Sequence, residues 1–388
     1  MDFALSSQQE AIREAVSRIC DRFDEHYWLE RDSSGEFPRE LHQALAHDGF
    51  LGICMPEAHG GSGLGIAEAA IMMQTISESG AGLTGASSVH MNIFGLNPVV
   101  VFGSDEQHKR MLPPLIEGRE QACFGVTEPD SGLDTTKLRT RAVRHGDSYV
   151  VNGQKVWISA AQTAHKMLLL ARTTPLEEVK KPTDGLSLFY TTIDRQRVEI
   201  KAIEKMGRKA VDSNQVFFDN WVIPAEDRIG EEGNGFRMIL HGLNPERILF
   251  AAEAVGLGFA ALKRASNYAR ERVVFGRQIG KNQGIQHPLA ESWIHLEAAR
   301  LLVMQAAWRY DQKMECGAAA NAAKYFAAEA GFNACTTAVM THGGMGYAKE
   351  YHVERYLREI MIARIAPVSP QMILCYIAEK VLGQPKSY

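Results

Sequence analysis

Glu246 and Arg247 place a carboxylate directly beside a guanidinium, in the sequence NPER. A carboxylate in a site closed to water can take a proton from carbon, so Glu246 is a candidate general base. The alternative is structural, because Pro245 suits the first position of a helix and an acidic first turn complements the helix dipole. The chain shows no zinc-type histidine spacing, Ser-His-Asp arrangement or GxSxG motif, and its 13 histidines are dispersed. No metal site is therefore expected.

A second segment, FGVTEPDSGLD at residues 124–134, combines hydroxyl and glycine residues. Thr127 offers a hydroxyl and an amide to the polar edge of a ligand, and Gly132 permits a close backbone approach. Taken alone, the segment is typical of a surface turn.

A third segment, NGQKVWIS at residues 152–159, opens with Asn-Gly, which predicts a hairpin turn between two strands. Trp157 and Ser159 are two residues apart, so the period of a strand places them on one face. The structural alternative is a hairpin with a core tryptophan.

Two more segments lie near the C-terminal end. Residues 272–276 read RVVFG and are followed by Gln283, and residues 340–346 read MTHGGMG. Without further context, Gly343 and Gly344 would simply cap the end of a helix.

The hydrophobic pattern predicts helices, then strands, then helices again. A capping box at Ser7 and Glu10 is expected to begin a helix, with further helices at residues 38–48, 66–80, 88–102 and 106–115. Short strands are expected at residues 148–151, 154–158, 167–171, 186–192, 198–203 and 215–218. The chain is helical again from about residue 236, with a last helix from Ser369-Pro370. We therefore predict an α+β multidomain chain with a helical domain at 1–120, a β-domain at 121–232 and an antiparallel helical bundle at 233–388.

The composition excludes several classes of function. A net charge of -4 and the lack of a basic stripe argue against nucleic-acid binding. The six cysteines are scattered without a CxxC pair and are expected to be free thiols. No stretch approaches the ~20 apolar residues of a membrane span, and the N-terminus lacks a signal-peptide pattern. A cytoplasmic protein is expected, with a mature organellar matrix protein as the alternative.

These segments together resemble the acyl-CoA dehydrogenase family along nearly the whole chain. Residues 127–134 are similar to its TEPxxGSD signature and residues 152–159 to its NGxKxWI[TS] strand. The C-terminal segments are similar to its RxxFG…Q and GGxG elements. The chain departs from the first signature at Leu133, where the family usually has serine. The resemblance implies an N-terminal helical domain, a central β-barrel-like domain and a C-terminal four-helix bundle, assembled as a dimer of dimers.

The resemblance also implies a bound FAD. It places Trp157 against the flavin and Ser159 near flavin N5, and it places Arg272 on the FAD of a neighbouring subunit. The planar, permanently charged fork of arginine suits pyrophosphate oxygens. The complete set of implied FAD contacts is Phe124, Val126, Thr127, Gly132, Leu133, Trp157, Ser159, Arg272, Phe275, Gln283, Met340, His342, Gly343, Gly344, Ser369 and Gln371.

The base that the resemblance implies is not at its commonest place. Many members carry a glutamate where this chain has Pro367, whose side chain can neither donate nor accept a proton. Members that act on branched or longer acyl chains place their base at the position of Glu246, which we therefore predict to be the base. The residues expected near the substrate are Leu133, Asn244 and Arg247, the last beside CoA. Candidates for lining the acyl tunnel are Met91, Phe94 and Phe250.

The expected reaction is FAD-dependent α,β-dehydrogenation of an acyl-CoA thioester to the trans-2-enoyl-CoA, in a homotetramer. Electrons are expected to pass to an electron-transferring flavoprotein. Two alternatives stay open. A flavin monooxygenase or oxidase on the same fold needs no α-proton base, and the missing glutamate at position 367 favours it. A non-catalytic scaffold that binds FAD or acyl-CoA predicts loss of flavin-facing residues that this chain retains.

Overall fold

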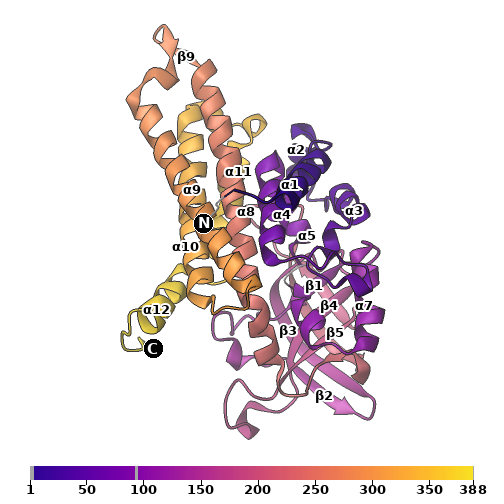
Figure 1. Cartoon of the computed structure of the whole chain (residues 1–388). Helices are drawn as coiled ribbons and strands as arrows, with labels where there is room; N and C mark the ends of the chain where they lie inside the picture. The colour runs from indigo at the N-terminus through magenta and orange to yellow at the C-terminus, as the bar shows by residue number, and fades with distance from the viewer. Residues whose placement is uncertain (1–3, 92–94, 388) are drawn as a thin grey trace.

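The computed structural model describes residues 4–91 and 95–387 of the chain. Figure 1 shows the N-terminal helices and the β-sheet stacked together, with long C-terminal helices standing beside them. In sequence order, the described elements are helices, then strands, then helices. This arrangement confirms the predicted α+β class with its helical, sheet and helical parts.

The N-terminal part consists of helices α1 (Ser7–Cys20), α2 (Glu25–Ser34), α3 (Arg39–His47), α4 (Ile66–Ile76), α5 (Gly82–His90), α6 (Asn97–Phe102) and α7 (Asp105–Ile116). The capping box predicted at Ser7 and Glu10 is wrong by one residue. The Ser6 hydroxyl accepts a hydrogen bond from the Gln9 amide at 3.2 Å, and the Gln9 side chain accepts one from the Ser6 amide at 3.1 Å. Glutamine serves in this motif as well as glutamate does.

Two of the predicted N-terminal helices are interrupted. The helix predicted at 66–80 ends at Ile76 and passes into a π-helical turn, Ser77–Ala81, in which Gly80 has a φ of 108°. The single helix predicted at 88–102 is wrong, because α5 ends at His90 and α6 begins at Asn97. Asn97 precedes a proline, which disfavours a helical conformation before it, so a new helix begins there. Residues 92–94, and with them Phe94, lie outside the described residues.

The central sheet contains β1 (Ala122–Gly125), β2 (Arg141–His145), β3 (Ser148–Ser159), β4 (Lys166–Arg172), β5 (Leu186–Thr192), β6 (Val198–Ala202), β7 (Ser213–Pro224) and β8 (Arg228–Ile229). The strand order is β6-β7-β3-β2-β4-β5-β8, and β1 pairs in parallel with β4. Alternate residues of β4 enter two hydrophobic clusters, one of which also contains side chains from α7. Both faces of β4 are therefore buried, which explains its continuous apolar sequence.

The hairpin predicted at Asn152-Gly153 is wrong, because β3 runs through both residues. The turn between β2 and β3 lies at residues 146–147 instead. At Gly153 the register with β7 shifts, and its φ is 144°. A Cβ atom at Gly153 would lie 2.7 Å from Thr140 Cα. Glycine is therefore needed here for a close approach of two backbones and a strand irregularity, which the Asn-Gly pattern alone does not distinguish from a turn.

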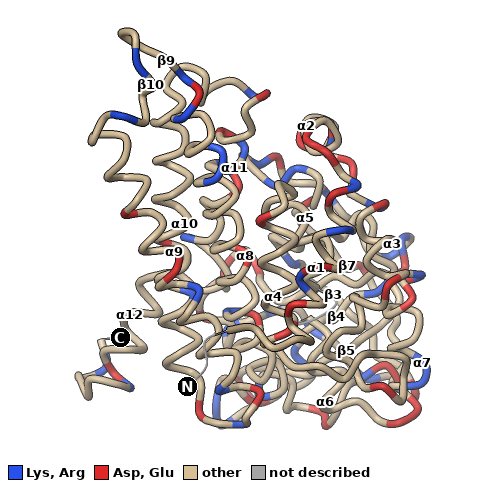
Figure 2. Tube along the Cα trace, turned by 45° about the horizontal axis from the view of Figure 1, so that its top comes forward, with Lys and Arg blue, Asp and Glu red and all other residues tan. Residues whose placement is uncertain are grey.

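The C-terminal part contains the long helices α8 (Gly235–Glu271), α9 (Gln283–Asp311) and α10 (Gly317–His342), then α11 (Val353–Ile360) and α12 (Pro370–Lys380). The three long helices run side by side, and α12 lies at one end (Figure 1). At the other end, a small hairpin of β9 (Val273–Val274) and β10 (Arg277–Gln278) joins α8 to α9. Figure 2 shows basic positions on this hairpin and few charged positions along α10.

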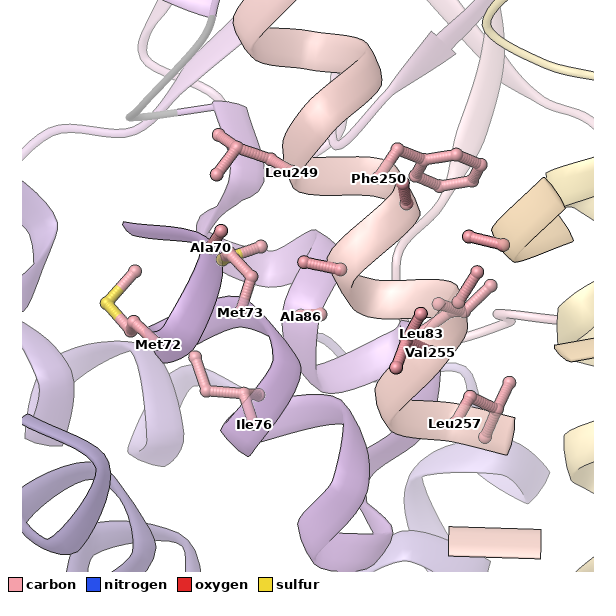
Figure 3. Close-up of a cluster of buried hydrophobic side chains, with 14 of the residues drawn as sticks. Ala70, Met72, Met73, Ile76, Leu83, Ala86, Leu249, Phe250, Val255 and Leu257 are labelled. Atoms are coloured by element: carbon pink, nitrogen blue, oxygen red, sulfur yellow. The ribbon is translucent and has the colours of Figure 1, made fainter. Parts of the chain in front are cut away.

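A buried apolar contact joins the N-terminal helices to the bundle. Figure 3 shows Leu249 of α8 pointing toward Ala70 and Met73 of α4. A Cβ atom at Gly256 would lie 2.3 Å from the Gln74 carbonyl oxygen, so the two helix backbones touch there. This contact fixes the helix face on which Glu246 lies relative to the N-terminal part.

Residues 4–91 and 95–387 contain no candidate membrane span and no candidate metal site. No helix in these ranges is both long enough and apolar enough to cross a membrane, and no group of three or more His, Cys, Asp or Glu residues could hold a metal ion. All six cysteines are free.

Candidate active site

Glu246 lies in the interior of α8, eleven residues after Gly235 at its start. The interpretation of Pro245 as a first helical residue is therefore wrong, since Pro245 is also within the helix. A carboxylate so far from the N-terminus gains little from the helix dipole, whose effect falls off within the first turn. The structural alternative for Glu246 loses its basis.

Glu246 is half-buried, and charged side chains surround its carboxylate. Burial raises the pKa of Glu246 to about 7, while the charges of His90, Arg247 and Lys324 oppose the rise and that of Glu253 adds to it. A general base is most effective when its pKa lies near the working pH. The surroundings thus give Glu246 the proton affinity of a base that acts near neutrality.

Arg247 and Lys324 are the two cationic side chains of helices α8 and α10 near Glu246. Arg247 Nη1 donates to Asn244 Oδ1 at 3.2 Å, while its buried Nε has no partner among the described residues. Lys324 of α10 donates to the Val368 carbonyl at 2.8 Å. Burial lowers the pKa of Lys324 to about 8, and Glu246 opposes that shift. Lys324 therefore connects the vicinity of Glu246 to the loop that carries Pro367.

The segment at 124–134 is held against β3 by a buried ion pair. Phe124 lies in β1, and the carbonyl of Val126 and the carboxylate of Glu128 both accept hydrogen bonds from Lys155 Nζ at 2.9 Å. Burial alone would raise the pKa of Glu128, but the charge of Lys155 and hydrogen bonds from residues 139–140 hold it below its usual value. Thr127 accepts from the Val156 amide at 2.9 Å. The second and third chemistry-bearing segments are thus brought together.

Trp157 and Ser159 project from the part of β3 where its pairing with β7 is irregular. Trp157 has a φ of 63° and is 59% exposed, whereas Ile158 between the two is buried. The interpretation of Trp157 as a core residue is therefore wrong. In the segment that Lys155 joins to β3, Leu133 is 61% exposed, and a Cβ atom at Gly132 would meet nothing within 4 Å. Each of the two segments thus presents an exposed apolar side chain.

The remaining predicted cofactor residues lie elsewhere. At the start of α12, Ser369 caps the helix by accepting from the Met372 amide at 3.3 Å, and Gln371 is exposed. The others gather at the far end of the bundle, which we call the bundle tip: Arg272, Phe275, Gln283, Met340, His342, Gly343 and Gly344. Arg272 follows the last residue of α8, about 40 Å along the helix from Glu246.

Most bundle-tip residues face outward. Phe275 is fully exposed, Met340 is largely exposed, and a Cβ atom at Gly343 or Gly344 would meet nothing within 4 Å. His342 differs: its ring stacks on Tyr268 of α8 at 4.3 Å and bonds the Ala338 carbonyl, so it is buried and holds α10 to α8. The bundle tip stands at the opposite end of the long helices from β3, the strand that carries Trp157 and Ser159 (Figure 1).

Family models agree with this architecture. Models of the N-terminal, middle and C-terminal domains of acyl-CoA dehydrogenases match residues 6–119, 123–221 and 233–382. The chain belongs to the acyl-CoA dehydrogenase family.

Individual relatives match over nearly the whole length. Acyl-CoA dehydrogenase FadE12 of Mycobacterium tuberculosis is 37% identical over 395 aligned residues, covering 100% of this chain and 99% of the relative. The caffeyl-CoA reductase-Etf complex subunit CarC of Acetobacterium woodii is 34% identical, covering 92% of this chain and 90% of the relative. The solved butyryl-CoA dehydrogenase from Megasphaera elsdenii superposes with a TM-score of 0.93 at 29% identity, covering 98% and 100% of the two chains.

Acyl-CoA dehydrogenases are flavin-dependent, and two surfaces of this chain fit parts of a flavin dinucleotide. The open surface at Trp157 and Leu133 offers an aromatic and an apolar side chain to a planar ring. The bundle tip offers the exposed Arg272 and the uncovered backbone of Gly343 and Gly344, which suit phosphate oxygens and a close approach.

Several residues of the site went unassigned in the sequence. Glu128 and Lys155 lie within residues 124–134 and 152–159. The inward position of a lysine in a strand is the pattern that could have indicated a buried ion pair. Glu253 is the one charged residue in the apolar run at 248–261, which also marks it. For His90 and Lys324 no local pattern separates them from ordinary helix residues.

Proposed function

We propose that this chain is an FAD-dependent acyl-CoA dehydrogenase that converts an acyl-CoA thioester to the trans-2-enoyl-CoA. The observation that carries the proposal is Glu246, a half-buried carboxylate among charged side chains, whose pKa is raised by burial to about 7. Its charged neighbours come from α5, α8 and α10, which supports a site built between these helices. The exposed Trp157 and the neighbouring Ser159 supply the face on which FAD would lie.

Glu246 takes the proton from the α carbon of the thioester. The pair of electrons left on the α carbon forms the double bond to the β carbon, from which a hydride departs. FAD, when bound, supplies the acceptor for that hydride. Arg247, whose Nε lacks a partner among the described residues, offers a donor to the CoA portion, and Asn244 orients it. The half-buried setting of Glu246 limits the access of bulk water to the proton transfer.

We further propose that electrons leave through an electron-transferring flavoprotein. The name of the Acetobacterium relative, a subunit of a reductase-Etf complex, supports a partner of this kind. We also propose a homotetramer in which the bundle tip of one subunit completes the FAD site of another. The position of the bundle tip at the far end of the long helices from β3 supports this, since Arg272 then lies away from Trp157 of its own chain (Figure 1).

The test is anaerobic mixing of the FAD-loaded protein with a panel of acyl-CoA thioesters. We expect loss of the flavin absorbance with at least one of them and formation of the matching enoyl-CoA. Reoxidation is then followed with an electron-transferring flavoprotein and, separately, with oxygen.

Three outcomes would contradict the proposal in different ways. Fast reoxidation by oxygen with peroxide formed, and none by the flavoprotein, would identify an oxidase. A hydroxylated product would identify a monooxygenase, the function that Pro367 favours. Tight binding of FAD and acyl-CoA without any bleaching would identify a non-catalytic scaffold.

A further inference from the structure

A cluster of polar side chains lies beyond Glu246, where all three parts of the fold meet. Glu253 is two turns farther along α8, and its carboxylate bonds His90 Nδ1 at the end of α5. Arg208, in the connection between β6 and β7, donates to Ser87 Oγ at 2.9 Å, one turn before His90 on α5. Ligand sites occur preferentially at such junctions between domains.

Packing alone does not account for this cluster. Glu253 is 0% exposed, and its Oε2 has no hydrogen-bond partner within residues 4–91 and 95–387. A buried charge with an unsatisfied oxygen is costly, and such groups in native proteins call for a functional explanation. Arg208 adds a φ of 54°, a conformation that residues other than glycine adopt at a cost and often at functional sites.

The cluster is placed to meet the distal part of an acyl group. Glu246, Phe250 and Glu253 are spaced i, i+4 and i+7, so they share one face of α8. The distance from Glu246 to Glu253 along the helix is about 10 Å. The Phe250 and His90 rings meet edge to face, with centroids 6.1 Å apart. Phe250 therefore lies between Glu246 and the polar cluster.

The charges of the cluster balance one another. Burial lowers the pKa of Arg208, and the carboxylates of Glu253 and Glu359 counteract that shift. Glu359 is also paired with Arg355 at 2.9 Å. Lys205 also lies near Arg208, and the carboxylates of Glu359 and Asp212 act on it. Three cationic side chains thus meet three carboxylates, so a further negative charge has no counterpart. A neutral oxygen, able to accept from Arg208 and donate to a carboxylate, suits the site best.

We propose that Ser87, His90 and Arg208, supported by Glu253, form a specificity subsite for acyl groups with a distal hydroxyl-type oxygen. The inference rests on the proposed dehydrogenase function and names its substrate class. A plain alkyl chain has no oxygen to bond with Arg208 and Glu253. Sites built to hydrogen-bond a substrate discriminate against analogues that lack the group.

The experiment compares octanoyl-CoA, ω-hydroxyoctanoyl-CoA and suberyl-CoA as reductants of the flavin in the FAD-loaded enzyme. We expect kcat/KM for the ω-hydroxy thioester to exceed that for octanoyl-CoA by about tenfold, the effect of one good hydrogen bond. Suberyl-CoA, which brings a carboxylate, should be the poorest of the three.

Neighbouring serines provide a matched control. Ser87 and Ser88 are 8% and 6% exposed, but Ser88 bonds the Gly85 carbonyl within its own helix at 2.7 Å. Ser87→Ala and Arg208→Leu should reduce the tenfold preference to about twofold or less, while Ser88→Ala should leave it unchanged. If Arg208→Leu fails to fold, Ser87→Ala still decides.

The proposal is overturned if octanoyl-CoA or suberyl-CoA is the best reductant, or if Ser87→Ala keeps the preference of the unaltered enzyme. If no thioester reduces the flavin, the dehydrogenase proposal fails. The subsite is then judged by calorimetric binding of the same thioesters to the FAD-loaded protein, where tighter binding of the ω-hydroxy compound supports it and equal binding sinks it.

Discussion

The surroundings of Glu246 and the bundle tip lie about 40 Å apart along α8, and polar groups are buried in one and exposed in the other. Near Glu246, charged side chains are withdrawn from water and contact one another across elements, as His90 does with Glu253. At the bundle tip, the side chain of Phe275 and the backbone of Gly343 stand open. One region is nearly complete within a single chain, and the other presents surfaces without a covering partner among the described residues.

This difference indicates which functions one chain supports by itself. Interior charges hold a fixed geometry and shifted pKa values, which proton transfer from carbon requires. Exposed aromatic and basic groups gain their binding energy only when a ligand or another subunit covers them. We therefore expect changes near Glu246 to affect chemistry and folding, and changes at the bundle tip to affect cofactor retention.

The largest expected effect follows from Glu246→Gln. Glutamine keeps the size of the side chain but cannot accept the proton, so the rate of flavin reduction should fall by about 10³-fold or more. Anaerobic stopped-flow absorbance measures this rate, and acyl-CoA binding should persist. Glu297→Gln on α9, where the carboxylate pairs with Arg300 at 2.7 Å, serves as the control.

A glutamate introduced at position 367 tests whether the base can act from the adjacent loop. Lys324 connects Glu246 to the loop at Pro367, so a glutamate at 367 should reach the same proton. Pro367→Glu in the Glu246→Gln background should restore part of the lost rate. Unchanged reduction in Glu246→Gln itself would exclude this residue as the base and leave the family assignment intact.

The next effect concerns the contribution of the buried ion pair between Lys155 and Glu128 to stability. Lys155→Met leaves Glu128 buried without its counter-charge and should lower the free energy of unfolding by about 3 to 5 kcal/mol. Denaturant unfolding followed by circular dichroism measures it. Lys201→Met breaks an exposed pair with Glu199 and should change stability by less than about 1 kcal/mol. Equal effects of the two substitutions would mean that burial does not distinguish these ion pairs.

At the bundle tip the expected effect is on binding. Arg272→Gln removes a charged donor proposed to contact a pyrophosphate, so the dissociation constant for FAD should rise about 10- to 100-fold. FAD fluorescence on dilution measures release. Arg277→Gln, in the same hairpin and bonded to Asn282, is the control and should retain FAD. If Arg272→Gln also retains FAD, the proposed contribution of the bundle tip to the cofactor site is wrong.

The same contrast explains what the sequence predicts well. The strand at residues 186–192 coincides with β5, because its period and bounding residues are local properties. Asn152-Gly153 misleads because the decisive contact is Thr140 on a neighbouring segment. Motif residues such as Trp157 can be found from their pattern, but the pairing of His90 with Glu253 depends on how α5 packs against α8. Such contacts between distant segments leave no local pattern in the sequence.

The smallest effect, counted per pH unit, is the pH dependence of Glu246. Its pKa in the folded chain is about 7, against an ordinary 4.5, so the rate of flavin reduction should fall tenfold per pH unit below about 7 and level off above it.

Between pH 4.5 and 7 the folded state holds a proton that the unfolded state has lost, so Glu246 makes stability decrease as pH rises, by at most about 1.4 kcal/mol per unit. Glu246→Gln should remove both slopes. Stopped-flow rates and unfolding curves across this range measure them, and a rate that is flat down to pH 5 would place the titrating base outside the buried cluster. In contrast, Arg272→Gln should alter neither slope, since the bundle tip is exposed and distant from the proton transfer.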